Sequence, residues 1–359
     1  MSQPEQDRTV SLAEAAPGAI TIAPAAIYPR RPPAFANLDL LDLGDRRALE
    51  SRWETTEQEA PAILLHNLGE ALAAPPGVVW LPDGRVVAES LHNLNAASRA
   101  ASLAEPMPQA PDHPQPRRPA LLLVRAGSTN YGHFLAEHLG ALLLLGQVRP
   151  GLRAELVVAD HRGAMLGVVE EGVARAGFAP QALRRLPPRG LHLQEVLMLS
   201  PASIHSYMKH PAAIEALAGL APPRPAGELL FVRRTSVAKR VLLNIDPVEE
   251  MALSLGFRAI EPGRMSFAEQ IEAFAAARVV VGVSGADLTN IVFMPPGGDV
   301  VCLLPTRGRE FFFWDLCCLR DHRYWSIFGA PETDRGGGHD DFTVDVDLTR
   351  SVLRQALAG

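Results

Sequence analysis

The sequence predicts an α/β protein with two Rossmann-like domains that face each other across a cleft. Three observations predict this fold. The chain has 359 residues, enough for about two domains. From residue 120 onward, short apolar runs alternate with helical stretches, which is typical of βαβ units and parallel sheets. A proline-rich seam at 221–226 interrupts this alternation, which then starts again.

Composition places the chain among globular proteins. Hydrophobic residues make up 47% and charged residues 21%, so a sizeable core can form and wholesale disorder is excluded. The net charge of −6 argues against a protein that coats nucleic acid, and no nucleic-acid partner is expected. Cys302, Cys317 and Cys318 form neither a disulfide framework nor a zinc cluster, which indicates a reducing compartment.

The chain shows no signature of a secretory or membrane protein. Its first thirty residues lack a basic start followed by an apolar core. The longest apolar stretches, 119–124 and 139–145, are far shorter than the ~20 residues of a membrane span. We therefore expect a cytoplasmic protein without a transmembrane segment. Peripheral association with the inner membrane, through a partner or a lipid-linked acceptor, stays open.

The first half of the chain is predicted to hold an extended arm and the first domain. Residues 1–35 are rich in alanine and proline and indicate the arm. The first domain is expected over 36–220, with a β-hairpin near 77–90 around Asp83-Gly84 and a proline-rich linker at 105–118. The elements predicted after the linker are strand 121–124, helix 132–148, strand 156–159, helix 165–177 and strand 196–199.

The second domain is expected over 228–359. Its predicted elements are strand 229–232, helix 247–255, strand 258–260, helix 267–276, strand 279–283, helix 286–293, strand 300–303 and a helical stretch over 311–319. A glycine loop at 336–338 precedes a last strand and helix.

The sharpest local motif is the segment 279–290, in which an apolar strand leads into Gly282 and Gly285 and a helix starts at once. Glycines there let a ligand approach the backbone, and a helix N-terminus offers free N–H groups to an anion. The spacing matches neither a P-loop nor a G-x-G-x-x-G fingerprint. An ordinary tight strand-to-helix turn therefore stays the alternative.

Paired arginines end the first strand of the second domain. Arg233 and Arg234 follow the apolar run 229–232, and Arg240 comes a short loop later. Guanidinium groups at the carboxyl end of a strand can clamp a diphosphate, and solvated loop charges, favoured for Lys239, are the alternative. Because side chains alternate along a strand, we expect one of Arg233 and Arg234 to face the cleft.

A polar stripe opens the first-domain helix. Asn130, His133 and Glu137 lie at i, i+3 and i+7 and so share one helix face. An imidazole and a carboxylate there could supply a general base or bind a sugar. Alternatively, Asn130 caps the helix while the other two are solvated. No third ligand stands at a usable spacing, so no metal site is expected.

Taken together and in this order, these segments resemble glycosyltransferase family 61, which includes capsular-polysaccharide biosynthesis proteins. The resemblance spans roughly residues 80–325. It rests on Asn130-Tyr-Gly-His-Phe134, on Phe231-Val-Arg-Arg234 with Arg240 and Asn244, on Glu269-Gln270 with 275–277, and on the block 285–297.

The resemblance implies a GT-B-like architecture and an inverting transfer of a sugar from a nucleotide-sugar donor to a glycan acceptor. The implied setting is surface or capsular polysaccharide biosynthesis, with polysaccharide-assembly proteins as further partners. No tightly bound cofactor is expected, and a metal is not expected to be required. The candidate bases are Glu137, His133 and Asp287. On the acceptor side the resemblance implies Asn130 and Tyr131. The residues expected to bind the donor are Arg233, Arg234, Arg240, Asn244, Gly282, Ser284, Gly285, Ala286, Thr289 and Asn290.

Three positions depart from the family pattern. The family usually has His where Ser284 stands, Glu where Ile245 stands and an acidic residue near Cys302. These departures leave a second hypothesis, in which the protein is a catalytically degenerate scaffold of a polysaccharide-assembly complex.

Overall fold

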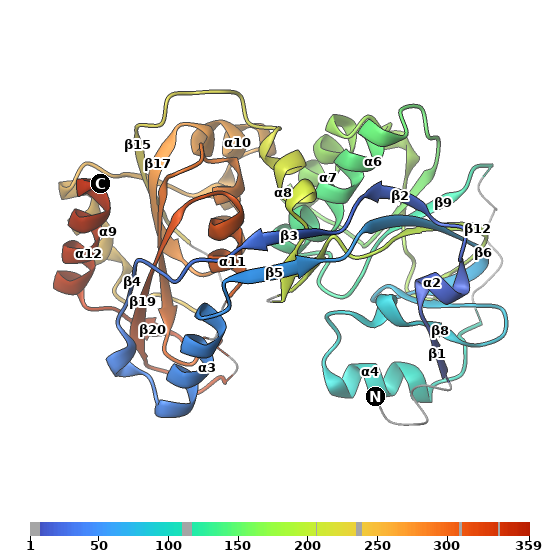
Figure 1. Ribbon diagram of the computed structural model, residues 1–359, viewed down its shortest axis with the longest axis horizontal. Coiled ribbons are helices and arrows are strands. Elements are labelled where there is room, and N and C mark those ends of the chain that lie inside the picture. Colours follow the sequence, from blue (N-terminus) through green and yellow to red (C-terminus); the bar gives the residue numbers. More distant parts are fainter. Residues whose placement is uncertain (1–7, 110–116, 206, 235–238, 309–310, 337) are drawn as a thin grey trace. The chain divides into compact units, whose positions relative to one another are not determined.

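The computed structural model describes residues 8–109, 117–205, 207–234, 239–308, 311–336 and 338–359. It divides the chain into two compact units (Figure 1). The first contains Met1–Ala26 and Ala60–His205, and the second contains Ile27–Glu59 and Ser206–Gly359. Each unit is built on a sheet with parallel strands and has helices. The prediction of an α/β protein is confirmed, whereas the cleft between the units stays a prediction.

The sheet of the first unit combines a parallel part with an antiparallel part. Strands β12, β9, β10 and β11 are parallel neighbours in that order, and β6 runs antiparallel to β12. The hairpin predicted near 77–90 is confirmed by β7 and β8, which pair at Trp80 and Val86. The strands are β1 (Thr9–Val10), β2 (Ile20–Ala23), β6 (Ile63–Ala74), β7 (Val78–Trp80), β8 (Val86–Val87), β9 (Ala120–Leu123), β10 (Glu155–Val158), β11 (Leu183–Arg185) and β12 (Leu191–Leu199); a short β13 (Ser203–Ile204) follows.

The main helix of this unit runs without a break over residues 131–148, close to the predicted 132–148. It consists of α5 (Tyr131–His133), the π-helical turn η3 (Phe134–Leu139) and α6 (Gly140–Val148). Every residue of the π turn is buried, so this wider turn lies in the interior of the unit. The other helices are α2 (Leu12–Ala15), η2 (Ala88–Leu91), α4 (Ala96–Ala104), α7 (Ala164–Arg175) and η4 (Pro180–Ala182).

The sheet of the second unit is doubly wound. Five parallel strands lie in the order β16-β15-β17-β18-β19, so the chain starts in β15, moves to one side and then crosses back to the other. This reversal lies between β15 and β17. The strands are β15 (Glu228–Val232), β16 (Arg258–Ile260), β17 (Ala277–Val283), β18 (Asp299–Pro305) and β19 (Arg323–Pro331), with β4 (Phe35–Ala36) and β20 (Phe342–Thr343) paired to β19.

Helices cover both faces of this sheet, with α9 and α12 on one side and α10 and α11 on the other (Figure 1). The core under α9 and α12 joins Val248 and Val352 to Val279 and Val281 of β17. The helices are η1 (Leu38–Leu40), α3 (Leu43–Trp53), α8 (Pro211–Ala218), α9 (Ile245–Ser254), η5 (Pro262–Arg264), α10 (Phe267–Ala275), η6 (Ala286–Phe293), α11 (Phe312–Leu319) and α12 (Val346–Ala358), and the short strands β3 (Ala26–Pro29), β5 (Glu57–Ala60) and β14 (Met208–Lys209) complete the unit.

The expected extended arm over 1–35 is corrected by the structure. Within its described part, β1 and β2 join the first sheet, while β4 pairs with β19 in the second sheet. Apolar side chains such as Val10 and Tyr28 are buried, which explains why an alanine- and proline-rich segment packs here. Residues 27–59 consequently belong to the second unit, not to the first domain expected over 36–220. The linker expected at 105–118 contains residues 110–116, which lie outside the described residues.

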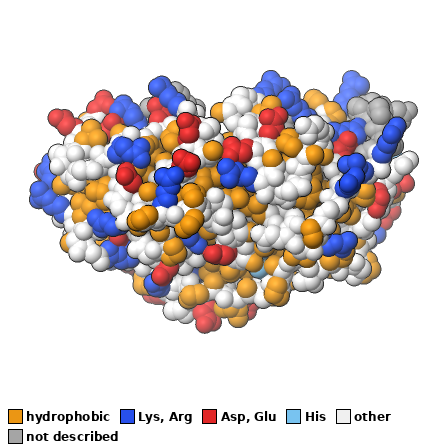
Figure 2. All heavy atoms as spheres, turned by 90° about the horizontal axis from the view of Figure 1, so that it is seen from above, with side chains coloured by type: hydrophobic (Ala, Val, Ile, Leu, Met, Phe, Trp, Pro, Cys, Tyr) orange, Lys and Arg blue, Asp and Glu red, His pale blue; other side chains and the backbone are white. Residues whose placement is uncertain are grey.

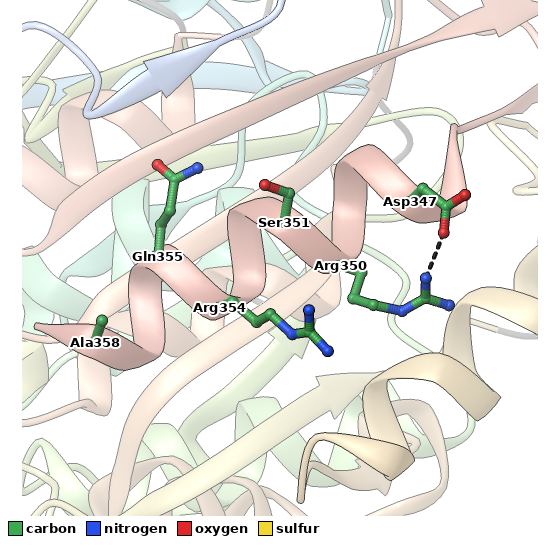
Figure 3. A pocket seen from close by; sticks show the side chains of 6 residues that line it. All are labelled: Asp347, Arg350, Ser351, Arg354, Gln355 and Ala358. Carbon is green, nitrogen blue, oxygen red and sulfur yellow. Dashed lines mark hydrogen bonds and ion pairs between the residues drawn. The ribbon is translucent and has the colours of Figure 1, made fainter.

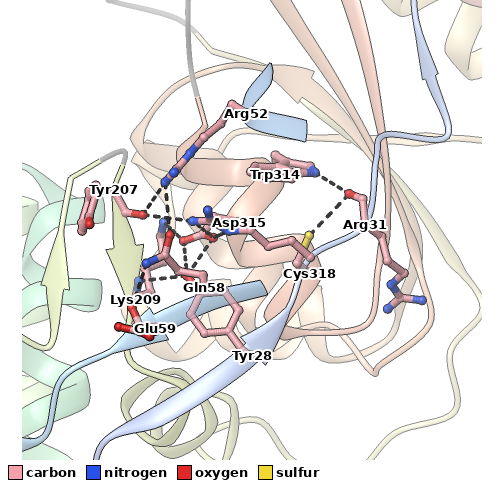
Figure 4. Close-up of polar contacts among 11 residues, drawn as sticks. Tyr28, Arg31, Arg52, Gln58, Glu59, Tyr207, Lys209, Trp314, Asp315 and Cys318 are labelled. Carbon is pink, nitrogen blue, oxygen red and sulfur yellow. Dashed lines mark hydrogen bonds and ion pairs between the residues drawn. The ribbon is translucent and has the colours of Figure 1, made fainter. Parts of the chain in front are cut away.

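A buried ionic cluster ties residues 27–59 to the rest of the second unit (Figure 4). The Asp315 carboxylate of α11 accepts hydrogen bonds from Tyr28 Oη at 2.8 Å, Arg30 Nε at 2.9 Å and Lys209 Nζ at 3.2 Å. The Lys209 side chain is fully buried, and its ammonium lies 4.1 Å from the centre of the Phe312 ring. Burial, together with the Asp315 charge, raises the pKa of Tyr28 well above its ordinary value, so its hydroxyl stays a donor.

Charged side chains of both signs are interspersed on the face shown in Figure 2. A hollow lies along α12, whose residues alone line it; Asp347 is paired there with Arg350, and Arg354 is exposed (Figure 3). Among the described residues, the helices all fall short of the length and apolar character that crossing a bilayer requires.

His322, between α11 and β19, is buried as a neutral ring. The Gly298 N–H donates to Nδ1 at 3.2 Å, so the ring proton lies on Nε2, which contacts the Ile291 carbonyl oxygen at 3.2 Å. Burial lowers the pKa of His322 to about 4 from an ordinary value of 6.5. Protonation at Nδ1 would remove the acceptor that the Gly298 N–H uses.

The free energy of unfolding should therefore fall as the pH drops from 6.5 to about 4. In this window the unfolded chain binds a proton at His322 and the folded chain does not, which costs about 3 kcal/mol in total. Urea unfolding of the wild type and His322→Gln at pH 7 and pH 4 measures this. We expect the difference between them to shrink by about that amount at pH 4. An unchanged difference would contradict the assignment.

Candidate active site

The strand order of the second unit marks where its ligand site should lie. In open α/β sheets, ligands bind outside the carboxyl ends of the two strands at which the chain reverses direction. Here these strands are β15 and β17. Arg233 and Arg234 follow β15, and Ser284 and Gly285 follow β17, so two of the motifs found in the sequence meet at this edge.

The two arginines after β15 point in different directions. Arg233 is held by α9: it is hydrogen bonded to Glu249, and its Nη2 donates to Asp246 Oδ1 at 3.0 Å. Arg234 lies against Gly285, where a Cβ atom would be 2.8 Å from Arg234 Nε. Burial, and then the neighbouring Arg240, lower the pKa of Arg234. One of the two arginines therefore faces the end of β17, as the alternation along the strand predicts, and it is Arg234.

Arg240 completes a small cationic corner. Its Nη1 donates to Ser284 Oγ at 3.2 Å, and its backbone has a left-handed φ of 55°. Lys239 O accepts a hydrogen bond from Arg234 Nη1 at 3.2 Å, so the two arginines are joined through the chain between them. Two guanidinium groups next to a glycine at the end of a parallel strand form an arrangement suited to a diphosphate.

The helix after Gly285 is a 3₁₀ helix, η6, and not an ordinary α-helix. Asp287 lies in its first turn near Arg234 and Glu261, and burial raises the pKa of this carboxyl. Ala286 is half-buried at the start of the same helix. Thr289 and Asn290 point into the unit: both are buried, and Asn290 Nδ2 donates to Gln270 Oε1 at 2.9 Å.

Gly282 and Asn244, also expected to bind the donor, have structural contacts. A Cβ atom on Gly282 would lie 2.9 Å from Val232 Cβ, so this glycine allows β15 and β17 to approach. The Asn244 side chain is bonded twice to the backbone of Val344, at 2.7 and 3.2 Å, and fixes the start of α9.

The positions that depart from the family pattern lie in different surroundings. Ser284 contacts Arg240 as described. Cys302 is fully buried in β18, and Ile245 is packed against the core of the second unit. Two of the three departures thus add apolar side chains to the interior.

In the first unit, His133 and Glu137 form a hydrogen-bonded pair. His133 Nδ1 lies 2.6 Å from Glu137 Oε1, and the side chain of Glu137 is completely buried while that of His133 is 20% exposed. Asn130 Oδ1 accepts from the backbone N–H groups of Gly132 and His133, so Asn130 caps this helix. Tyr131 is half-buried next to it.

Three residues that sequence reasoning missed hold this pair in place. Asn93 Nδ2 donates to Glu137 Oε2 at 2.8 Å, and the His205 ring stacks on His133 with 4.7 Å between ring centres. Gly127 touches the imidazole from the third side, where a Cβ atom would lie 3.2 Å from His133 Nδ1. Asn93 and His205 are far from His133 in sequence, so no local spacing predicts that they contact the pair.

A buried carboxylate bonded to one nitrogen of a partly exposed histidine leaves the other nitrogen for chemistry. The carboxylate orients the ring, as carboxylates do in many general-base sites. The adjacent His138 differs: burial holds its pKa well below 6.5, and its Nε2 contacts Ser128 Oγ at 2.8 Å. Among the described residues, no three His, Cys, Asp or Glu side chains gather in a way that could hold a metal ion.

Comparisons with known proteins agree with the sequence motifs. Residues 131–301 match the family model described as Glycosyltransferase 61, so the resemblance to this family is confirmed over that segment. An alpha-1,3-arabinosyltransferase of Oryza sativa subsp. japonica is 27% identical over 129 residues, which are 35% of this chain and 20% of that protein. The chain thus matches about a fifth of the length of this curated relative. Among solved structures, an E. coli heptosyltransferase with ADP is 11% identical with a TM-score of 0.33, and the match covers 67% of this chain and 99% of that one.

Proposed function

We propose that this protein is an inverting glycosyltransferase that moves a sugar from a nucleotide-sugar donor to a glycan acceptor. The observation that carries the proposal is the corner formed by Arg234, Arg240 and Gly285 at the reversal point of a doubly wound sheet. The match of residues 131–301 to Glycosyltransferase 61 supports it.

In this proposal the second unit binds the donor. The departing nucleoside diphosphate carries the negative charge that develops as the bond to the sugar breaks. Arg234 and Arg240 balance this charge with fixed guanidinium groups, and the backbone at Gly285 adds N–H donors. Two cations supply the role that a divalent ion has in other transferases, so we propose that the donor is used without a metal and without a tightly bound cofactor.

In the same proposal the first unit supplies the base. His133 Nε2 takes the proton of an acceptor hydroxyl while the hydroxyl oxygen attacks the anomeric carbon and the diphosphate leaves with the bonding electrons. Glu137, bonded to Nδ1, stabilises the resulting imidazolium. A single attack from the face opposite the leaving group inverts the anomeric centre. Asp287 is the second candidate, since burial raises the pKa of its carboxyl.

The biological setting is the assembly of a surface or capsular polysaccharide, in which a pentose or a hexose is added to a growing glycan. The arabinosyltransferase relative supports a sugar-transfer role, and a pentose is the first donor class to test. We place the reaction in the cytoplasm, with polysaccharide-assembly proteins as partners.

The donor site is tested by a thermal-shift panel of UDP, GDP, CMP and dTDP, each with and without EDTA. At a hundred times its dissociation constant, a ligand stabilises the fold by about 2.7 kcal/mol. We expect one nucleotide to raise the melting temperature whether EDTA is present or not. Stabilisation that EDTA abolishes would contradict the metal-independent mechanism.

Arg234→Ala and Arg233→Ala form a matched pair for the same site. Loss of charge-assisted hydrogen bonds to phosphate should weaken nucleotide binding by about 10- to 150-fold in Arg234→Ala. Arg233→Ala should keep the affinity, since Arg233 is engaged with Asp246 and Glu249. Isothermal titration measures both. If no nucleotide binds at all, the catalytically degenerate scaffold becomes the better proposal.

A further inference from the structure

The first unit contains a cavity of about 620 Å³ that none of the donor residues lines. Its walls come from the segments that follow three neighbouring parallel strands, β9, β10 and β11, and from the turn between β6 and β7. Convergent strand ends of this kind form ligand sites in α/β units. By contrast, the hollow on α12 in Figure 3 is lined by one helix.

The polar lining of the cavity is strongly cationic. Arg125, Arg162 and Arg185 line it against one carboxylate, Asp160. Arg125 is buried, and its Nη2 donates to the Leu199 carbonyl oxygen at 2.8 Å. Arg162 Nη2 and Arg185 Nη1 lie 2.5 and 3.5 Å from oxygens of Asp160. These exposed pairs contribute little on their own, so an incoming anion can share their guanidinium groups.

Apart from the segment Gly127–Thr129, the remaining lining is apolar. Four prolines contribute to it, two from each of two segments, together with Val124, Ala159 and Leu186; the prolines are Pro75, Pro76, Pro187 and Pro188. Proline rings have no rotatable side chain, so packing a ligand on them costs little conformational entropy. The C–H face of a sugar ring is the flat, weakly apolar surface that such a wall suits.

One wall of the cavity also contacts His133, the proposed base. The segment Gly127–Thr129 lines the cavity, and Gly127 touches the ring of His133. Gly127 therefore contributes both to the cavity lining and to the surroundings of His133, in a loop that leads directly into the helix. This continuity links the cavity to the acceptor half of the reaction.

We infer that the cavity binds the glycan acceptor and that this acceptor is an acidic saccharide, with its anionic group on Arg185 and Arg162 and a sugar ring on the prolines. Naming the occupant as acceptor rests on the proposed function. The anion is a carboxylate, as in a uronic acid, or a phosphate, because guanidinium forks bind both.

The test is titration of the full chain, without donor, with a glucuronate-containing disaccharide, its neutral glucose counterpart and glucose 1-phosphate. We expect the acidic probes to bind at least about tenfold more tightly than the neutral disaccharide. Preference for glucuronate identifies the anion as a carboxylate, and preference for glucose 1-phosphate identifies it as a phosphate. Equal affinity for the acidic and neutral probes would overturn the inference.

Neighbouring arginines provide the control. Arg185→Ala should weaken binding of the acidic probe by about tenfold. Arg184→Ala should leave it unchanged, because Arg184 is paired with Glu155 and does not line the cavity. Equal losses in the two variants, or displacement of the probe by a nucleoside diphosphate, would also overturn the inference. If a nucleotide binds and the saccharide does not, this inference is wrong and the proposed function stands. If the saccharide binds and no nucleotide does, the proposed transferase function is wrong, but the cavity still binds an acidic saccharide.

Discussion

We expect His133→Ala to lower the turnover number by about 10²- to 10⁴-fold while the KM for the donor stays nearly constant. The variant loses the proposed base, whereas the donor corner is built from residues of the other unit. Initial rates at saturating donor and acceptor measure this effect. Full activity of the variant would contradict the assignment of His133 as the base and would favour Asp287.

Glu137→Gln distinguishes positioning from simple structural damage. An amide in place of the carboxylate keeps the shape of the site but no longer stabilises the imidazolium, so we expect a loss of about tenfold or more. The KM for the donor should stay nearly constant in this variant, because the residues proposed to bind the donor belong to the second unit. A loss of rate that comes with a lower free energy of unfolding would show structural damage instead.

The surface pair of His192 and Glu70 is the matched control. His192 Nε2 lies 2.8 Å from Glu70 Oε1, but both side chains are exposed and distant from the buried pair in sequence. His192→Ala should leave the rate unchanged. A comparable loss there would show that removing any His–Glu pair damages the unit.

The second large effect is expected on stability. Asp315→Ala should lower the free energy of unfolding by about 3–5 kcal/mol, because it leaves Arg30 and Lys209 buried without their counter-charge. Urea-induced unfolding, with an unchanged slope against urea, measures the loss.

A surface ion pair of the same unit provides the comparison. Arg31 is paired with Asp321 where both side chains are more than half exposed. Arg31→Ala should therefore cost less than about 1 kcal/mol. A loss below 1 kcal/mol in Asp315→Ala as well would mean that water reaches the cluster and stabilises the orphaned cations.

Much of the second unit could be predicted because its signals are local. The bounds predicted for β16 are those observed, and β15, β17 and α10 differ by one or two residues at an end. Their apolar runs are short and bounded by glycine, proline or a capping serine. The sequence does not predict strand β6, because polar and apolar residues do not alternate regularly over its middle, His66–Ala71. Strand β19 was missed as well.

A contact in the candidate site could be predicted where both of its residues lie on one helix or strand. His133 and Glu137 lie on one helix, and the alternation after β15 predicts that Arg233 and Arg234 diverge. Thr289 and Asn290 turned inward because η6 has three residues per turn and not 3.6, which changes the face that each later side chain occupies. The Asp315 cluster joins positions almost 290 residues apart, and no spacing rule reaches that far.

The pairing of β4 with β19 has a consequence for how the chain is made. Phe35 of β4 pairs with Trp325 of β19. The segment with Phe35 therefore leaves the ribosome before the strand with which it pairs has been synthesised. At about 5–20 residues per second, the interval between them is roughly 15–60 s of translation. During that time Tyr28 and Arg30 have no Asp315 to bind. A chain that ends before β19 lacks the strand with which β4 pairs, so residues 27–59 cannot complete their native contacts in the second unit.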